Sequence, residues 1–371
     1  MSLRIGGIGW VTPLGSGVRE VWQHLLDGET ATAETISSPL DGHAFPVFRV
    51  PPAAIADVPP HPRLRRSSVI SRFAVGAGLA ALKDAGVVLD PATAERTALM
   101  FAVSNGGVIY TKRFYNEVVE SGAQAASPLL FPETVFNAPA SHLAAIMGIS
   151  GASYTLVGDG AVGLLALKMA EDLMLNPALD RCLVVGAEEA DWLLCDAYRR
   201  WRLLRDAPPI EVFRPQRRGT ILSEGAGAVL LDRSGVVALE NVEAGCNFEH
   251  QRDTAACVAK VFANLNATSD DTIFASANGT FIDDAERAAI LRQCAAARVF
   301  SLKPALGESV GASSLWQVIA AAEALRSGQR PPAAQPLNQS ARCDATPPRR
   351  AIVSACGMNQ QVAGLSLAIA Q

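Results

Sequence analysis

The sequence predicts an α/β protein built from two similar halves, each with its own largely parallel β-sheet covered by helices. Short apolar runs of strand length alternate along the chain with longer segments whose apolar residues recur at helical spacing. This β–α–β rhythm starts again near residue 236, so the second half is expected to repeat the element order of the first. Hydrophobic residues make up 49% of the 371 residues and charged residues 18%, which favours a large core over a disordered chain.

In the first half, the expected strands are apolar runs bounded by turn-forming residues. They lie at residues 3–9, 97–103, 154–157 and 182–185. The expected helices have a 3.6-residue period, and Val21, Trp22 and Leu25 mark one apolar face of the first. These helices lie at residues 18–26, 68–86, 108–121 and 161–175. Residues 29–62 are rich in Pro, Ala and Asp and are expected to form a long surface excursion.

The second half shows the same rhythm of elements. From residue 220 onward, expected strands lie at residues 220–231, 236–246, 272–276, 298–302, 351–355 and 363–370, and expected helices at residues 252–265 and 313–327. The first of these strands is interrupted at Gly225 and Gly227. The turn Asp232-Arg233-Ser234-Gly235 separates the halves, which predicts an N-terminal half of residues 1–235 and a C-terminal half of residues 236–371. The duplication rests on element order, because the residues themselves show no convincing repeat.

Composition argues against several classes of function. Lys and Arg number 32 and Asp and Glu 36, so the net charge is −4 and nucleic acid is not an expected partner. No apolar run reaches the roughly 18–20 residues that a membrane span needs. The first residues lack the features of a signal peptide, so a cytoplasmic protein is expected.

Motifs for metals and cofactors are likewise missing from the sequence. Seven cysteines without a C-x-x-C pair indicate neither a zinc site nor a disulfide framework. Gly7-Ile8-Gly9 begins like a dinucleotide-binding loop, but Thr12 stands where the third glycine belongs. We therefore expect neither a metal nor a cofactor.

A set of short blocks covers the chain from residue 3 to about residue 369 in a fixed order. The most distinctive are WVTPLGSG at 10–17, SRF at 71–73, the segment 137–153, VVGAEEA at 184–190, SEGAG at 223–227, SLK at 301–303 and GA at 311–312. Each block is weak alone, but the ordered set resembles the β-ketoacyl synthases of the thiolase fold. The resemblance implies two pseudo-duplicated α/β halves in a layered α-β-α-β-α core, and a place among the acyltransferases that act on acyl carrier proteins.

The position of the family's nucleophile is occupied by a glycine. In that family a cysteine at a helix N-terminus attacks the acyl thioester. When segment 151–164 is matched to the family on Gly151, Ser153 and Gly163, the cysteine position holds Gly160. The neighbouring Asp159 could act as a nucleophile instead, but its expected role is the N-cap of the following helix, which aspartate favours.

The two histidines of the family are also replaced. The first normally follows Ala in an Asn-Ala-His-Gly-Thr block, and that position holds Asn278, which can donate a hydrogen bond but cannot shuttle a proton. The second corresponds to Glu308, whose negative charge would repel a developing enolate. The family's lysine is retained as Lys303, with a salt bridge to Glu308 as its expected role. Cys356 lies near the family's gating loop, which lacks its phenylalanine here, and is interpreted as a small buried residue.

The resemblance therefore implies a synthase-like chain without the catalytic groups. Such members, called chain-length factors, pair with an active ketosynthase in a pseudo-symmetric heterodimer and shape its acyl tunnel; their usual residue at the cysteine position is Gln. The expected setting is bacterial fatty-acid, polyketide or aryl-polyene-type biosynthesis, with an acyl carrier protein as a further partner. Two alternatives stay open: an acyl-transfer or decarboxylating enzyme that uses Asp159, Asn278, Glu308 and Lys303, and a homodimer that binds an acyl chain or a carrier protein.

Overall fold

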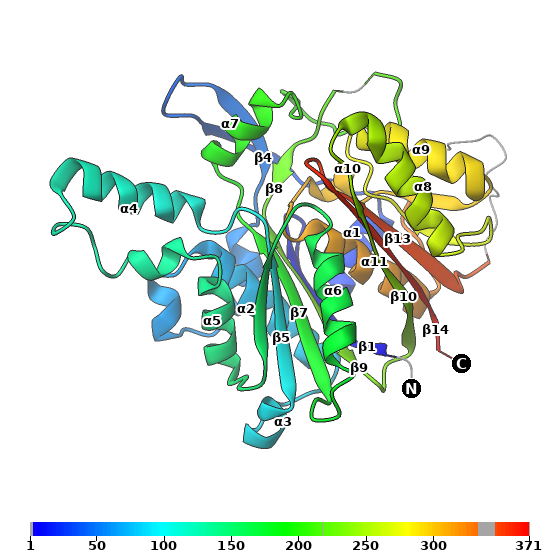
Figure 1. Cartoon of the computed structure of the whole chain (residues 1–371), viewed down its shortest axis with the longest axis horizontal. Helices are drawn as coiled ribbons and strands as arrows, with labels where there is room; N and C mark the ends of the chain where they lie inside the picture. The colour runs from blue at the N-terminus through cyan, green and yellow to red at the C-terminus, as the bar shows by residue number, and fades with distance from the viewer. Residues whose placement is uncertain (1–2, 217, 333–345, 371) are drawn as a thin grey trace.

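The computed structural model describes residues 3–216, 218–332 and 346–370, and within these ranges two α/β halves follow one another (Figure 1). The main strands of the first half are β1 (Arg4–Thr12), β5 (Thr97–Val103), β6 (Ser153–Val157), β7 (Arg181–Glu188) and β9 (Gly225–Asp232). Those of the second half are β10 (Val237–Asn247), β11 (Thr272–Phe274), β12 (Arg298–Phe300), β13 (Arg350–Cys356) and β14 (Gln361–Ile369). Each of these strands overlaps one that the sequence predicts.

The two halves share one strand order. It is β6-β5-β7-β9-β1 in the first half and β12-β11-β13-β14-β10 in the second. In both halves the second strand in the sequence pairs in parallel with the third and the fourth. In both, the fifth strand runs antiparallel to the fourth and to the first. The repeated order confirms the expectation of two pseudo-duplicated α/β halves.

Two expectations about the sheets are wrong. The sheets are mixed rather than largely parallel, because the last two strands of the chain are joined by a short turn. Residues 357–360 connect β13 to β14, whereas a parallel partner needs a crossover of about a dozen residues. The sheets are also not separate: β1 pairs with β10 through Arg4 with Ala238 and Ile5 with Val237, so one hydrogen-bonded ladder runs through both halves.

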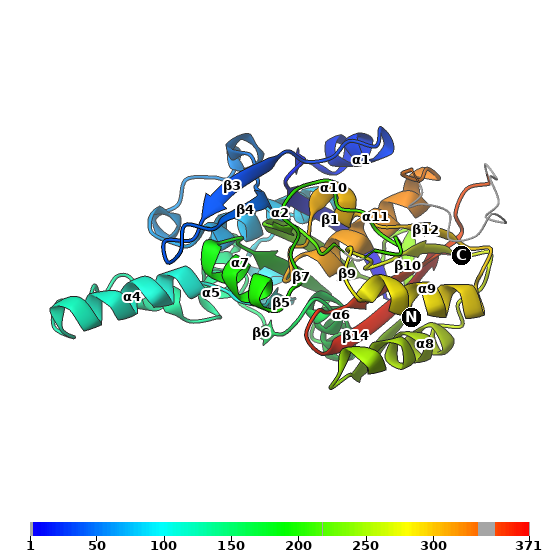
Figure 2. The same cartoon turned by 90° about the horizontal axis from the view of Figure 1, so that it is seen from above.

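Helices form three layers around the sheets (Figures 1 and 2). On the outer face of the first sheet lie α2 (Val69–Asp84) and α5 (Ala138–Met147), and on that of the second lies α8 (Thr254–Asn264) with α9 (Ile282–Gln293) against it. The central helices, α6 (Val162–Leu173) and α11 (Ser313–Ser327), contact strands of both halves. Because α11 is covered on all sides, it is apolar or small around nearly its whole circumference, with Ala320, Ala321 and Ala322 fully buried.

Close packing of α2 on β1 depends on two glycines of the first strand. A Cβ at Gly7 would lie 2.1 Å from the carbonyl oxygen of Ala81, and one at Gly9 would lie 2.3 Å from that of Ala77. Neither position can hold a larger residue unless the helix moves. The Gly7-Ile8-Gly9 sequence therefore serves helix packing.

The excursion at residues 29–62 is more ordered than expected. Its strands β3 (Ala33–Ser37) and β4 (Ala44–Phe48) form a small sheet with β8 (Leu222–Ser223). Phe45, Val47 and Phe48 are buried there, which anchors the excursion to the core. The predicted strand 220–231 is accordingly divided into β8 and β9, with the break at Glu224 and Gly225, where φ of the glycine is +144°.

The remaining elements are connections and insertions. They are β2 (Gly15–Ser16), α1 (Val18–Leu26), η1 (Pro52–Ile55), η2 (Pro62–Arg65), α3 (Pro91–Glu95), α4 (Val108–Ser121), η3 (Phe131–Thr134), α7 (Trp192–Arg200), η4 (Gln251–Asp253) and α10 (Lys303–Leu306). Helix α1 has the predicted bounds, whereas α3, α7, α9 and α10 were not predicted. In Figure 2, α4 extends away from the rest of the molecule.

Within the described residues, none of the helices has both the length and the apolarity to cross a bilayer. The same residues include no cluster of His, Cys, Asp and Glu side chains suited to holding a metal ion. β9 ends at Asp232 and β10 begins at Val237. We therefore keep the division into residues 1–235 and 236–371 as a proposal, with its boundary in this connection.

Candidate functional site

The predicted nucleophile elbow lies between β6 and α6. Asp159 is 8% exposed there, and its Oδ2 accepts hydrogen bonds from the backbone N–H groups of Asn359 (2.8 Å) and Gln360 (3.1 Å). The expected N-cap role of Asp159 is wrong, because α6 begins after Ala161 and has no side-chain cap. Two charge-assisted bonds instead attach the elbow to the turn between β13 and β14.

That turn lies directly on Gly160. A Cβ at this position would be 3.2 Å from Cα of Gly357 and 3.6 Å from the carbonyl oxygen of Cys356. Contacts of this length require the turn to yield by a few tenths of an ångström. Glycine at residue 160 therefore allows the backbones of the elbow and the turn to approach closely.

Asn278 is completely buried after β11, and both polar atoms of its side chain have hydrogen-bond partners. Its Nδ2 donates to Oε2 of Glu308 at 2.8 Å, and its Oδ1 accepts from the backbone N–H of Thr280 (3.2 Å) and from Oγ1 of Thr280 (2.6 Å). The backbone N–H of Asn278 donates to Oδ1 of Asp283. The amide is thus held in one orientation by partners on the protein itself.

Glu308 and Lys303 form a buried ion pair, which confirms the predicted salt bridge. Nζ of Lys303 lies 2.5 Å from Oε1 of Glu308, and the two side chains are 4% and 5% exposed. Burial lowers the pKa of Lys303, while the charge and hydrogen bond of Glu308 oppose that shift. The backbone N–H and C=O of Glu308 bond to Ile221 and Ser223, so its position is fixed by neighbouring strand β8.

The structure brings these predicted residues into one buried region. Lys303, Glu308 and Asn278 form a continuous chain of contacts. The backbone N–H of Cys356 donates to Oγ of Ser276, two residues before Asn278, while the turn that follows Cys356 covers the elbow. Cys356 is 4% exposed, as expected for a small buried residue, and burial raises its pKa well above the usual value.

Two buried glutamates of this region were missed by the sequence analysis. Glu188, at the end of β7, accepts hydrogen bonds from the backbone N–H groups of residues 104, 105 and 106, and burial raises its pKa to about 8. Glu286, on α9, accepts from the N–H and Oγ of Ser276, and burial raises its pKa to about 7. The available signals were an acidic residue ending the apolar run VVGAE, and the helical spacing of Glu286 with Ile282 and Ala289.

Negative charge dominates the chemistry that this arrangement can perform. The phenol of Tyr198 has its pKa raised by burial first and then by the charges of Asp159, Glu188 and Glu308. Besides the buried Tyr198 phenol, the Cys356 thiol and the hydroxyls of Ser276 and Thr280, the groups described in the region are carboxylates, one amide and one ammonium. Such a set binds and orients, but it offers neither a thiolate nor an imidazole for acyl transfer and decarboxylation.

The buried Glu286 predicts a pH dependence of stability. Its pKa is about 7 in the folded chain and near 4.5 when unfolded, so between these values the folded state holds a proton that the unfolded state has lost. The resulting stabilisation is complete below pH 4.5 and is lost as the pH rises through 7, by roughly 3 kcal/mol at about 1.4 kcal/mol per unit.

Glu286→Gln should remove that slope, because the amide reproduces the protonated acid. Ser354 lies close enough to Glu286 to oppose the effect of burial on its pKa, and Oε2 of Glu286 has no hydrogen-bond partner among the described residues. Urea unfolding at pH 5 and pH 7.5 measures the effect, with the exposed Glu95→Gln as the control. Parallel pH profiles for the wild type and Glu286→Gln would contradict the assignment.

The fold and this site define a duplicated α/β protein with a buried, carboxylate-rich site between its two halves. The family model described as "Beta-ketoacyl synthase, N-terminal domain" matches residues 2–235. Because the match covers more than half of the chain, the chain belongs to the β-ketoacyl synthase family. Nodulation protein E of Rhizobium sp. (strain N33) is 26% identical over 369 residues, with 92% of this chain and 90% of that protein covered.

Solved structures are similar over the whole length. The ishigamide ketosynthase/chain length factor has a TM-score of 0.86 at 20% identity and covers 100% of this chain and 99% of its own. A ketosynthase (ApeO) in complex with its chain length factor (ApeC) from Xenorhabdus doucetiae has a TM-score of 0.78 at 18% identity, with coverage of 100% and 98%. These likenesses show that the fold is the thiolase-like fold of ketosynthases.

Proposed function

We propose that this chain is a non-catalytic, ketosynthase-like subunit of the chain-length-factor type, which pairs with an active ketosynthase and shapes the acyl tunnel of that partner. The observation that carries the proposal is the buried chain of contacts from Lys303 through Glu308 to Asn278. We assign Gly160, Asn278 and Glu308 to the family's Cys-His-His positions. The proposed setting is bacterial fatty-acid, polyketide or aryl-polyene-type biosynthesis in the cytoplasm.

The ion pair supports a structural rather than a catalytic role for these residues. Glu308 neutralises Lys303 and also accepts from Asn278, so each group already has a partner at close distance. A group that acts on a malonyl thioester must be free to bind it and must carry a proton or positive charge toward the developing enolate. Glu308 presents negative charge instead, and Asn278 cannot exchange a proton at its amide.

Strand β6 offers a surface for the partner subunit. It forms the free edge of the sheet, where β5 is its neighbour, and its Tyr154 and Val157 are 49% and 52% exposed. An edge strand carries N–H and C=O groups that a second chain can pair. Helix α5 contacts both β6 and η3, and exposed apolar side chains continue along the α4–η3 segment. These are Tyr115, Val119, Leu129, Phe131, Val135 and Phe136.

Val157→Asp is expected to weaken pairing with a ketosynthase by about 10–100-fold, because the charge would be buried against the partner's apolar surface. The chain and the ketosynthase of the same genome are co-expressed, and their dissociation constant is measured by analytical ultracentrifugation. Leu175→Asp is the control, since Leu175 is 81% exposed and lies after α6, away from the free edge of β6.

Three results are informative in this experiment. A heterodimer that the Val157 variant weakens and the Leu175 variant retains supports the proposal. A homodimer that does not bind the ketosynthase would favour the alternative of a homodimer that binds an acyl chain or a carrier protein. A heterodimer of unchanged affinity in the Val157 variant would refute the β6 surface.

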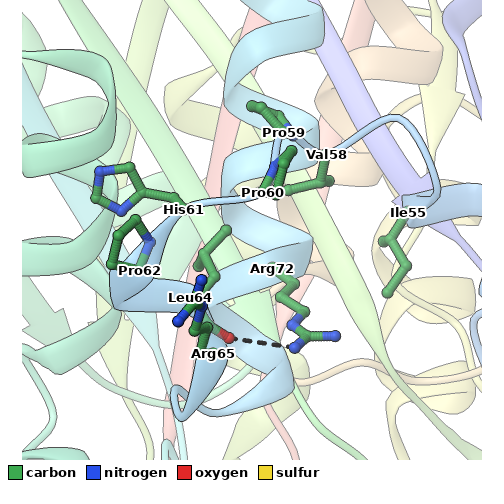
Figure 3. Close-up of a pocket in the computed structure, with 9 residues that line it drawn as sticks. All are labelled: Ile55, Val58, Pro59, Pro60, His61, Pro62, Leu64, Arg65 and Arg72. Carbon is green, nitrogen blue, oxygen red and sulfur yellow. Dashed lines mark hydrogen bonds between the residues drawn. The ribbon is translucent and has the colours of Figure 1, made fainter.

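A pocket at η1 and η2 supports an acyl carrier protein as the second partner. The pocket has a volume of ≈ 300 Å³, and Figure 3 shows Leu64 beside Arg65 and Arg72, with Arg72 donating to the carbonyl oxygen of Leu64. Arg63, Arg65, Arg66 and Arg72 are all exposed, whereas Asp57 is the one acidic residue of segment 51–66. An arginine-rich rim around an apolar pocket suits an acidic protein surface.

A further inference from the structure

A second arginine cluster lies in the loop between α7 and β8, and its central residue is buried. Arg205 is 9% exposed. Its backbone N–H donates to the carbonyl oxygen of Thr220, and the N–H of Thr220 donates to that of Leu203, so the two ends of the loop hold each other in place. Arg205 therefore projects from a fixed backbone.

Three arginines of this loop share one carboxylate at long range. Nitrogen atoms of Arg205, Arg214 and Arg218 lie 3.9, 3.8 and 3.8 Å from the oxygens of Glu211. Distances of this length are ion pairs without hydrogen bonds. Glu211 is 34% exposed, so its side chain can swing into solvent and leave three guanidinium groups facing the same space.

One donor of Arg205 is unused. Its Nε donates to the carbonyl oxygen of Ala207 at 2.7 Å, while its Nη1 is buried and has no hydrogen-bond partner among the described residues. A buried guanidinium N–H without an acceptor is costly. Burial lowers the pKa of Arg205, the charge of Glu211 opposes this shift, and the charge of Arg218 adds to it.

A pocket of ≈ 550 Å³ opens beside these groups. Its lining includes Arg205, Arg218, Glu211 and Asp206 together with Pro208 and Pro209. The lining itself holds two cations and two carboxylates, and Arg214, which lies outside the lining but 3.8 Å from Oε1 of Glu211, adds a third cation next to the pocket. An acceptor with several oxygens would satisfy Nη1 of Arg205 and bring the other two arginines to hydrogen-bond distance.

We propose that Arg205, Arg214 and Arg218 form a binding site for a phosphate-class anion, which takes the place of the Glu211 side chain. Guanidinium groups match phosphate oxygens bidentately, and a doubly charged phosphate attracts three arginines more strongly than one carboxylate does. A carbonate or chloride ion offers fewer oxygens or less charge for the same donors.

The loop also contacts the rebuilt site. The N–H of Phe213 donates to Oδ2 of Asp283, whose Oδ1 accepts from the N–H groups of Asn278 and Gly279. The N–H of Gly219 donates to the carbonyl oxygen of Gly279. A phosphate bound here would therefore lie on the outer side of the segment that contains Asn278 and Gly279. It could be free phosphate or the phosphate ester of a longer molecule.

Isothermal titration of the full chain with inorganic phosphate tests the site. We expect one binding site per chain, weakened about 5–10-fold by Arg218→Ala and by Arg214→Ala, both of which replace exposed side chains. Glu211→Gln should tighten binding by a similar factor, because it removes the competing carboxylate. Controls are Arg252→Ala, at a side chain that is 79% exposed and outside the loop, and Glu240→Gln, which removes one of the two acidic partners of Arg350.

The Glu211 variant separates a binding site from a structural ion-pair cluster. If the cluster serves stability alone, Glu211→Gln lowers the unfolding free energy without raising phosphate affinity, and the proposal fails. No binding to the wild type at 10 mM phosphate, or equal binding in all variants, would also overturn it. Tighter binding of 4′-phosphopantetheine than of phosphate would identify the ligand as a phosphate ester. Equal affinity for the two would identify it as free phosphate. Both measurements can be made without pairing with a ketosynthase.

Discussion

Gly160→Cys is expected to leave the chain unable to form a carbon–carbon bond between acyl groups, at a rate at least about 10⁴-fold below that of an intact ketosynthase. A new Cβ would lie 3.2 Å from Cα of Gly357, so the thiol fits only if the β13–β14 turn shifts. A thiolate formed there could accept an acyl group. The condensation step would still lack both imidazoles, and each lost donor typically costs about 100–1000-fold.

The residues around position 160 also explain why a cysteine alone should not restore condensation. Asn278 already donates one amide hydrogen to Glu308 and accepts from Thr280, and its amide cannot deliver a proton to an enolate. Labelled malonyl- and acyl-carrier protein are supplied to the variant, and the products are analysed by mass spectrometry. The wild type should acquire no acyl adduct at its cysteines.

Each possible product has a definite meaning. Self-acylation of the introduced thiol without a β-ketoacyl product fits the proposed function. A β-ketoacyl product would end the non-catalytic assignment. An acyl adduct on Asp159 of the wild type would instead favour the rewired acyl-transfer enzyme.

Lys303→Met is expected to lower the free energy of unfolding by about 3–5 kcal/mol, the usual cost of removing one partner from a buried ion pair. The carboxylate of Glu308 would remain 5% exposed with the amide of Asn278 as its side-chain partner. Uncompensated charge in a low-dielectric interior is the cause of the loss. Urea unfolding monitored by circular dichroism measures it.

The double variant Lys303→Met/Glu308→Gln provides the matched control. It removes both charges and keeps an amide beside Asn278, so much of the stability should return. A loss in the double variant that equals the sum of the losses in the two single variants would show that the pair does not interact. Lys168→Met, which breaks contacts with Glu171 and Asp172 at the surface, should cost less than about 1 kcal/mol.

Strand runs and helical periods were sufficient to predict most of the fold. The bounds of α1 and β5 match the prediction, and the repeated element order indicated the duplication. What the pattern could not show was strand direction, because an apolar run is the same whether its neighbour is parallel or antiparallel. The pairing of β1 with β10 at Arg4 and Ile5, which joins the two sheets, could not be predicted either. Two pairs of backbone residues produce no pattern in the side chains.

The candidate site, too, could be predicted only in part from the sequence. Because the residue types at 160, 278 and 308 lack a thiol and imidazoles, their chemistry could be judged from the sequence alone. The salt bridge between Lys303 and Glu308 was also expected from the sequence, because the two residue types carry opposite charges. The role of Asp159 could not be predicted, because its partners Asn359 and Gln360 are 200 and 201 residues away.

The sequence by itself therefore predicted most of the element types and the duplicated order, and it supplied the residue types on which the proposed loss of catalysis rests. Only the tertiary structure decided which charged groups are buried and what each of them contacts. Glu286 illustrates the reason: a glutamate has the same pKa in every sequence until folding removes its water, and burial here raises that pKa to about 7. Burial and contacts between distant residues exist only in the folded chain, and they determine which residues form a site.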